Sequence, residues 1–372
     1  MTETGTAPPP ALPTEALIFG LPEKRYHESE ALGSHAIQRL AIEPVEFWWE
    51  SAMNPLREQE EIEKEDLLVG RAYHKLVLEG REAFDAAFCA EPDPADFPGA
   101  LVTNRDMQAW LRERQLKVSG DKAELIARCK AADPDAPIWE EIEAKWVAGR
   151  TPIKWRAYQR ILLSAATITR NPDLARCFED GWSEVSVFWL EDGVPNKARI
   201  DYLKLLASVD LKSIGLRSLK SFATACKREI AQRRYDIQFV HYTEAREQAR
   251  KFVEAGKVYV WSDAAGAVPI DKIAPDDPLR RMAPPMKWLR VFARQADYTW
   301  SWVFVKKTGA PIAWACGMSQ DDPLFGLASE QRLRALDTWR ENMARYGREM
   351  WIYTAPFELI TGQDLPTWLG QD

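Results

Sequence analysis

Hydrophobic and polar residues alternate along three short segments between residues 184 and 214, after which the spacing becomes that of a helix. Alternation predicts strands, whereas apolar residues three or four positions apart, as in residues 219–230, predict an amphipathic helix. Glu184 opens the first predicted strand, Asp201 closes the second, and Asp210 lies near an end of the third. The pattern therefore predicts an α/β fold in which carboxylates gather near the ends of neighbouring strands.

The rest of the chain reads mainly as helices, with few further strands. Helices are expected over residues 30–50, 67–78, 138–178 (interrupted near Gly149 and Pro152), 243–255 and 327–346, a strand over 257–261, and a hairpin over 298–316. The Pro- and Thr-containing residues 1–22 predict a disordered lead. The expected parts are this lead, a helical region 23–98, a small insert 100–132, and a core with a terminal hairpin and helix, 137–372.

The insert reads as a helix, a short extended link and a second helix. The helices are expected over Asp106–Arg114 and Asp121–Cys129, and Leu116–Ser119 would link them. Pro- and Asp-rich segments on either side, 91–99 and 133–137, predict that residues 101–129 fold as a unit on the main body of the protein.

Composition narrows the class of protein. With 46% hydrophobic and 28% charged residues, the 372-residue chain resembles a globular protein. It contains no apolar run near the roughly 20 residues of a membrane helix. The first residues lack the features of a signal peptide, so no membrane contact and a cytoplasmic location are expected. Five scattered cysteines without a C-x-x-C pair argue against a zinc site and an iron–sulfur cluster.

The net charge of −7 is unevenly distributed. Residues 197–234 hold ten Lys or Arg against three acids. A basic region beside the acidic strand ends favours contact with a phosphate backbone, with Arg217 and Lys220 as candidate DNA contacts. The alternative is a solvated basic helix face.

The Asp-x-Lys triplet at Asp210 carries the candidate chemistry. Side chains on a strand alternate between faces, so Asp210 and Lys212 point to one side and Leu211 to the other. A cation held by Asp201 and Asp210 would leave Lys212 beside a water that attacks phosphorus. Such triplets are frequent on protein surfaces, so the interpretation depends on the order of the surrounding elements.

Two further patterns connect this triplet to a known family. One is Tyr-x2-Gln-x3-Tyr, formed by Tyr235, Gln238 and Tyr242, and the other is the stretch Gly70–Leu76, which contains His74. Together with the Asp-x-Lys core they resemble the RecB-like branch of the PD-(D/E)xK nuclease superfamily. The first helices and the terminal hairpin and helix are similar to those of RecE-type (exonuclease VIII) domains.

The resemblance implies a mixed central β-sheet flanked by helices, like that of restriction endonucleases. It implies a metal-dependent exonuclease that digests linear duplex DNA from a 5′ end, leaves 5′-phosphates and passes single strands to an annealing protein. Its Mg²⁺, for which Mn²⁺ substitutes, would be held by His74, Asp201, Asp210 and the backbone carbonyl of Leu211. Related exonucleases form rings, which leaves a homo-oligomer open.

The resemblance also suggests roles for the helical motif. Gln238 and Tyr242 lie four positions apart on one helix face, where they would fix the strands and contact the DNA backbone together with Tyr235. The alternative is a buried polar pair without contact to DNA. Glu184 ranks below the two aspartates, as a second-sphere acid, a ligand of a second metal ion, or a strand-end charge.

The insert is similar to a SAP motif, a small helix–link–helix module that binds DNA. The similarity rests on Leu111, Leu116, Val118–Gly120, Lys122–Ile126 and Arg128, and the insert departs from the motif at Gln115, where glycine is usual. Candidate phosphate contacts are Arg112, Arg114, Lys117 and Lys122. The alternative is a helical hairpin that packs on the nuclease body or docks a protein.

Two other functions remain open on the same residues. The chain could be an endonuclease selective for a DNA structure or sequence, or a DNA-binding protein without catalytic activity. The full set of His74, Asp201, Asp210 and Lys212 argues against the second.

Overall fold

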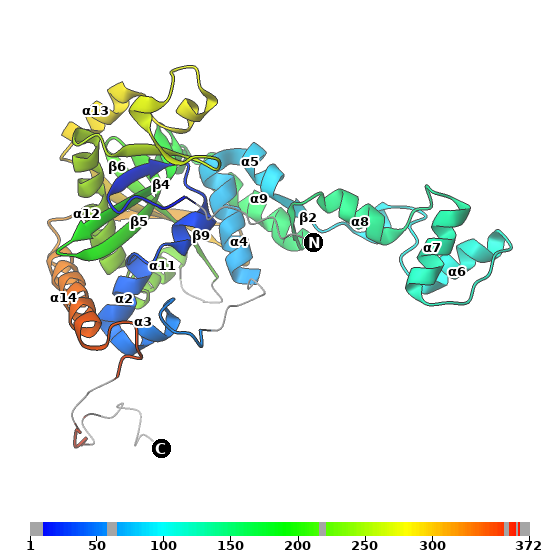
Figure 1. The fold of residues 1–372 in the computed structure, drawn as a ribbon, viewed down its shortest axis with the longest axis horizontal. Helices are drawn as coiled ribbons and strands as arrows, with labels where there is room; N and C mark the ends of the chain where they lie inside the picture. The colour runs from blue at the N-terminus through cyan, green and yellow to red at the C-terminus, as the bar shows by residue number, and fades with distance from the viewer. Residues whose placement is uncertain (1–9, 58–64, 216–220, 353–356, 362–363, 365–372) are drawn as a thin grey trace, which may run out of the picture.

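A computed structural model describes residues 10–57, 65–215, 221–352, 357–361 and 364, and the predicted α/β class is confirmed (Figure 1). Within these residues a central sheet of eight strands has the order β10-β9-β6-β5-β4-β1-β7-β8. Neighbours are antiparallel except β1 with β7 and β6 with β9. The sheet strands are β1 (Ala16–Phe19), β4 (Gly181–Glu191), β5 (Val194–Lys204), β6 (Ala207–Ile214), β7 (Val258–Ser262), β8 (Gly266–Pro269), β9 (Thr299–Lys306) and β10 (Ala313–Met318).

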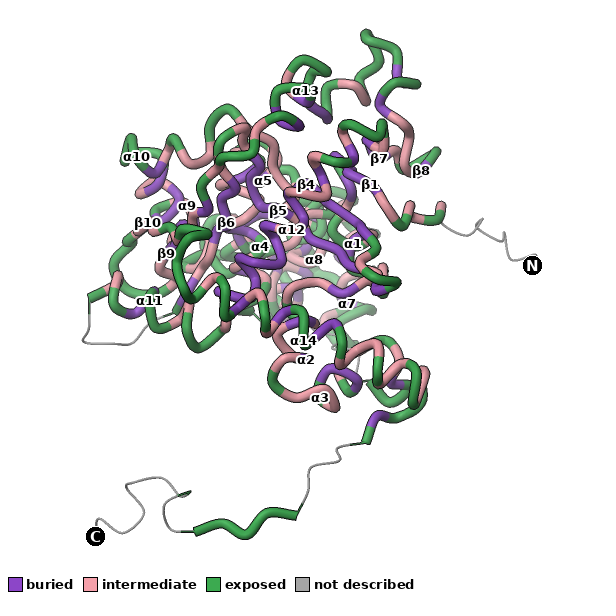
Figure 2. Tube along the Cα trace, turned by 90° about the vertical axis from the view of Figure 1, so that its left-hand side faces the viewer, coloured by how far each residue is buried: buried purple, intermediate pink, exposed green. Residues whose placement is uncertain are grey.

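The described residues form fourteen α-helices, most of which cover the two faces of this sheet. They are α1 (Glu23–Glu28), α2 (Ser34–Ile42), α3 (Pro44–Glu50), α4 (Glu65–His74), α5 (Gly80–Ala87), α6 (Asn104–Glu113), α7 (Lys122–Ala132), α8 (Trp139–Val147), α9 (Trp155–Thr169), α10 (Pro172–Ala175), α11 (Phe222–Gln232), α12 (Tyr235–Glu254), α13 (Met286–Arg294) and α14 (Pro323–Tyr346). On one face α12 contributes Phe239 to the largest core. On the other, Tyr73 of α4 and Ile161 of α9 pack with Leu211. The buried segments run along the strands between these layers (Figure 2).

The first strand corrects the expectation of a disordered lead through residue 22. All four residues of β1 are buried, and the strand lies between β4 and β7 in the interior of the sheet. An apolar run of four residues gives too weak a periodic signal to identify a strand, and both of its partners come much later in the chain. The expectation was therefore wrong for residues 16–19.

Other elements differ from the predicted ones in their ends. The predicted helix 30–50 is divided at Glu43, because Pro44 begins α3 as a new helix. Two short parallel strands, β2 (Phe88–Ala90) and β3 (Thr151–Ile153), form a separate pair that periodicity did not indicate.

The terminal hairpin and helix appear as predicted, in β9, β10 and α14. None of the described helices is long and apolar enough to cross a membrane.

The insert forms the far end of an arm that projects from the sheet and its helices (Figure 1). Both helices begin with a reciprocal capping box, at Thr103 and at Asp121. Gln115 takes the left-handed backbone conformation, with φ 59°, at the position where glycine would be easier. The helices enclose a core of their own, made of Leu101, Met107, Leu111, Leu125, Cys129, Ala136 and Ile138. The hairpin therefore has its own interior, which extends past the expected boundary at residue 132.

Leu125 is fully buried in this small core, so its truncation tests whether the arm is a separate folding unit. We expect Leu125→Ala to destabilise the arm by about 2–5 kcal/mol, because a cavity replaces buried methyl groups. Amide hydrogen exchange should accelerate throughout α6 and α7 and stay unchanged in α12. Leu125→Met, which nearly conserves volume, is the control. Equal acceleration of exchange in α12 would show that the arm and the central sheet unfold together as one cooperative unit.

Candidate metal and phosphodiester site

The site lies where two neighbouring strands separate. β5 and β6 pair only at Tyr202↔Val209 and Leu203↔Ser208. The backbone N–H of Leu211 donates instead to Asp201 Oδ2, at 2.7 Å. The Asp201 side chain thus satisfies a buried backbone donor that the ladder no longer satisfies. Contrary to the sequence expectation, Asp201 does not close its strand, because β5 continues to Lys204.

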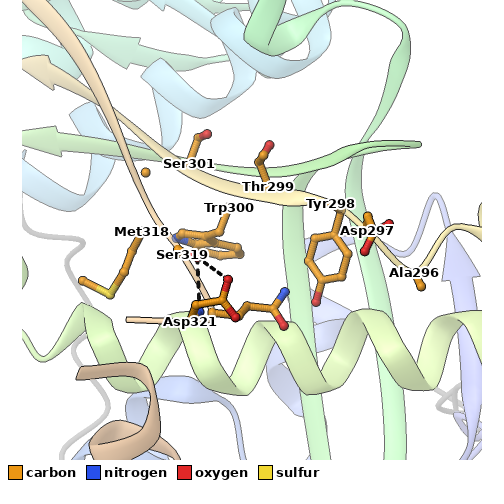
Figure 3. A pocket seen from close by; sticks show the side chains of 11 residues that line it. Ala296, Asp297, Tyr298, Thr299, Trp300, Ser301, Met318, Ser319 and Asp321 are labelled. Carbon is orange, nitrogen blue, oxygen red and sulfur yellow. Dashed lines mark hydrogen bonds between the residues drawn. The ribbon is translucent and has the colours of Figure 1, made fainter. Parts of the chain in front are cut away.

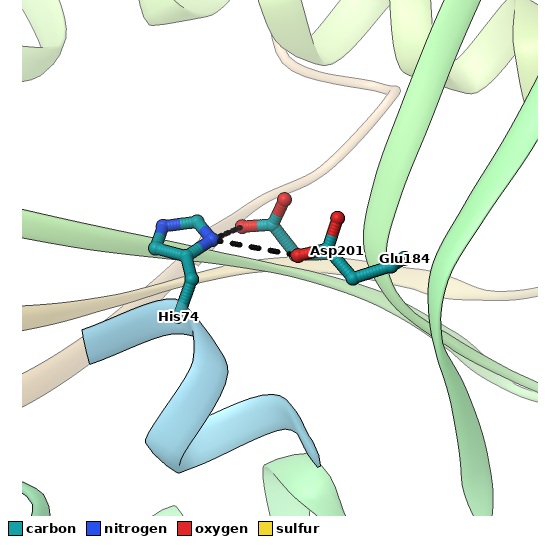
Figure 4. Close-up of side chains that lie close together, drawn as sticks. All are labelled: His74, Glu184 and Asp201. Carbon is teal, nitrogen blue, oxygen red and sulfur yellow. Dashed lines mark ion pairs between the residues drawn. The ribbon is translucent and has the colours of Figure 1, made fainter. Parts of the chain in front are cut away.

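His74, Glu184 and Asp201 form one cluster at this point (Figure 4). His74 Nδ1 lies 3.7 Å from Glu184 Oε1 and 3.8 Å from Asp201 Oδ2. One ligand atom from each residue lies within 4.8 Å of the others. His74 ends α4, and the chain continues as a π-helical turn, Lys75–Glu79, a form of helix often found at functional sites.

Glu184 lies inside β4 and does not open it. Its φ is 55°, in the left-handed region that is unusual for a residue other than glycine. The antiparallel pairs Ser183↔Tyr202 and Val185↔Ile200 flank this position, so Glu184 lies across from Asp201. The alternation of apolar and polar residues cannot reveal a residue with a left-handed backbone inside a strand. In the structure, the register of β4 and β5 brings the two acids together.

Asp210 belongs to a second, adjoining group. Lys212 Nζ lies 2.7 Å from Asp210 Oδ2, and Gln238 Nε2 donates to Asp210 Oδ1 at 2.9 Å. The same ammonium lies 4.9 Å from the centre of the Tyr235 ring. The structure therefore brings Asp210, Lys212, Gln238 and Tyr235 together. It does not place Asp210 in the three-residue cluster, where Glu184 stands instead.

Burial and nearby charges together decide the protonation of each group. Burial and the nearby Asp210 raise the pKa of Asp201 to about 7, although His74 opposes the shift. Burial alone would lower the pKa of His74, but Asp201 and Glu184 outweigh it and raise the pKa to about 9. Burial also opposes the charge of Lys212, but Asp210 outweighs it and holds the pKa above its usual value. Lys212 therefore acts as a fixed positive charge and not as a proton acceptor.

The cluster fits a divalent cation. Two carboxylates and one imidazole are donors that Mg²⁺ and Mn²⁺ accept, and water can fill the remaining positions. Burial is the main cause of the raised pKa of Asp201, so its ionised form is disfavoured in the protein alone. A bound cation would favour that ionised form.

A groove of about 950 Å³ passes along this cluster. His74, Glu184, Asp201 and Tyr242 line it, and Tyr242 is itself mostly buried. Asp210 and Gln238 are more deeply buried and do not line the described part of the groove. A second cavity of about 550 Å³ lies at the start of β9, around Tyr298 and the buried Trp300, and contains none of the candidate residues (Figure 3).

The remaining DNA-contact candidates are distributed differently. Arg217 and Lys220 lie outside the described residues. In the same basic segment, Lys197 donates to two backbone carbonyls, and Arg234 pairs with Asp236, so part of its charge serves internal contacts. Four candidates are on the arm, namely Arg112, Arg114, Lys117 and Lys122. Arg114 lies over the Trp110 ring, and Lys122 pairs with Glu140.

Comparison with known proteins supports the nuclease fold. The model of a family described as "PDDEXK-like domain of unknown function (DUF3799)" matches residues 50–260, which is more than half of the chain. The chain belongs to this family. The expected PD-(D/E)xK superfamily is thereby confirmed, whereas the RecE-type and SAP resemblances stay predictions. The matched PDDEXK-like region contains both groups of the candidate site and the arm.

One solved structure is similar to this PDDEXK-like protein at low identity. It is the crystal structure of a protein from Eubacterium rectale described as "Putative exonuclease". The identity is 12%, the TM-score is 0.44, and the alignment covers 91% of this chain and 96% of the other. The search among curated proteins gave no match.

Cation binding should release protons from the cluster. At about pH 7 the raised pKa values, about 9 for His74 and about 7 for Asp201, leave the imidazole protonated and the carboxyl partly so. A cation needs both groups deprotonated, so its affinity should rise from pH 6 towards pH 9. Calorimetry of Mn²⁺ binding in buffers of different ionisation enthalpy would count the protons. His74→Gln should release about one fewer, and an unchanged count would remove His74 from the site.

Proposed function

We propose that this protein is a Mg²⁺-dependent deoxyribonuclease that hydrolyses linear duplex DNA from a 5′ end, in phage-type recombination or DNA repair. The main support is the convergence of His74, Glu184 and Asp201 beside the Asp210–Lys212 pair. Membership of a PDDEXK-like family supports the same chemistry. The exonuclease mode and the polarity rest on the resemblance of the sequence to RecE-type domains.

Each group of residues has a part in the proposed reaction. His74, Glu184 and Asp201 would hold the cation, with Asp210 and the Leu211 carbonyl as the further ligands suggested by the sequence. The bound cation would polarise the phosphate and lower the pKa of the attacking water. Lys212 would orient this water and stabilise negative charge on the phosphate as it develops. Gln238 would keep Asp210 in place through its hydrogen bond, while Tyr242 lines the groove along which the DNA backbone would lie.

The proposed substrate is the end of duplex DNA, and the proposed partner is an annealing protein that takes the single strand. Radiolabelled linear duplex and a covalently closed circle, each incubated with Mg²⁺, separate the candidate activities. An exonuclease degrades the linear DNA and leaves the circle intact. Cleavage of the circle would identify an endonuclease. Binding of both DNAs without cleavage of either would identify a protein that only binds DNA.

Substitution of Lys212 separates catalysis from binding. We expect Lys212→Ala to lower the turnover rate by roughly two to three orders of magnitude, as when one electrostatic interaction with a transition state is removed. Mn²⁺ affinity should not fall, because loss of a nearby positive charge does not weaken cation binding, whereas Asp201→Ala should abolish both cation binding and cleavage. Lys272→Ala, which removes an exposed lysine, is the control. A rate for Lys212→Ala near that of the wild type would contradict its assigned role.

The arm should contribute binding but not chemistry. Replacement of Arg112, Arg114, Lys117 and Lys122 by glutamine should reduce the slope of log affinity against log salt by roughly 0.9 for each phosphate that is no longer neutralised. Because Lys122 already pairs with Glu140, its share should be the smallest. The turnover rate at saturating DNA should be unchanged. An unchanged salt slope would instead favour a structural hairpin or a protein-docking element.

A further inference from the structure

Arg199 lies beside the cluster and is held more firmly than a simple surface cation. It stands on β5 two positions before Asp201, so the two side chains leave the strand on the same face. Its guanidinium pairs with Glu184, and its Nη1 donates to the Leu21 carbonyl at 2.7 Å and to Ser186 Oγ at 3.3 Å. The charge also lies 5.8 Å from the centre of the Tyr26 ring. A forked group with partners in several directions has little freedom to move.

Glu184 needs such a partner for two reasons. Like charges directly opposite each other on antiparallel strands repel, and Glu184 lies across from Asp201. Its left-handed backbone, with φ 55°, is also unfavourable for a residue with a Cβ and persists only where the surroundings hold it. Arg199 is the diagonal neighbour of Glu184 across the two strands, because Arg199 pairs in register with Ser186, two positions after Glu184. It therefore both compensates the charge of Glu184 and restricts the carboxylate.

We propose that Arg199 is a positioning residue that holds the Glu184 carboxylate towards the cation site. One oxygen of Glu184, Oε2, contacts Arg199, while the other, Oε1, faces His74. The guanidinium thereby directs Oε1 into the cluster and leaves it available as a ligand. This inference rests on the proposed function in one respect, since the cation is the one that the nuclease would use.

Positioning and simple electrostatics predict opposite effects on cation affinity. A positive charge near the site repels a cation, so its removal alone would strengthen cation binding. Removal of a group that orients a ligand weakens metal binding, typically about 10–100-fold. Arg199→Lys and Arg199→Gln therefore distinguish the two effects. The first keeps the charge but not the forked guanidinium, and the second keeps neither.

The measurement is Mn²⁺ affinity by electron paramagnetic resonance, on the 372-residue chain without DNA. We expect both variants to bind Mn²⁺ about tenfold or more weakly. Wild-type affinity in Arg199→Lys together with tighter binding in Arg199→Gln would overturn the proposal. Ser186→Ala, which removes a neutral partner of the same guanidinium, should have a smaller effect. Near-ultraviolet circular dichroism and thermal unfolding identify any variant that has lost its fold.

A double-mutant cycle tests whether Arg199 acts through Glu184. In a Glu184→Gln background, which already lacks the charged ligand, Arg199→Lys should change Mn²⁺ affinity little. An undiminished effect in that background would also overturn the proposal. Because this readout needs no DNA, it is separate from the proposed nuclease activity. If the wild type binds Mn²⁺ but cleaves no DNA, the proposed function fails while the role of Arg199 is still tested.

Discussion

The separation of β5 from β6 beyond Tyr202 and Val209 is the constraint on which the site depends. Two strands that continued as a regular ladder would satisfy the Leu211 N–H with a backbone carbonyl and would leave no space between them. Here the Asp201 carboxylate accepts that hydrogen bond, which holds it at the place where the two strands separate. An unsatisfied buried donor costs about 1–3 kcal/mol, so Asp201 supports the backbone as well as a cation.

Charge compensation organises the buried residues around this point. Glu184 has Arg199 and His74 as cationic neighbours, and Asp210 has Lys212, while Asp201 has His74 beside it and Asp210 close enough to oppose its ionisation. Removing one member of a buried pair leaves an uncompensated charge, which is more costly than losing both. Burial and Asp210 raise the pKa of Asp201, so its ionised form is disfavoured. A divalent cation bound beside it would favour that form.

Local patterns in the sequence predicted the local parts of the structure well. The Asp-x-Lys strand, the terminal hairpin and helix, and the two helices of the arm appear near their expected positions because each depends on neighbouring residues. The membership of Glu184 in the cluster could not be read from spacing, since it depends on the register of two strands and a turned backbone. The basic segment that begins at residue 197 was expected to contact DNA, but part of it contacts other parts of the protein. Lys197, Arg199 and Lys212 are used in internal contacts, which a count of charges along the chain does not reveal.

The position of β1 has a consequence for how the chain is made. Its hydrogen-bonding neighbours are β4, which ends at Glu191, and β7, which ends at Ser262. During synthesis this apolar strand emerges before either of its partners, and both of its edges can be paired only after residue 262 has been added. Contacts so distant in sequence form slowly, and an unpaired strand exposed meanwhile invites association with other chains. A strand made before its partners is thus among the last to be paired, and a nascent chain interrupted before β7 would carry an incomplete sheet.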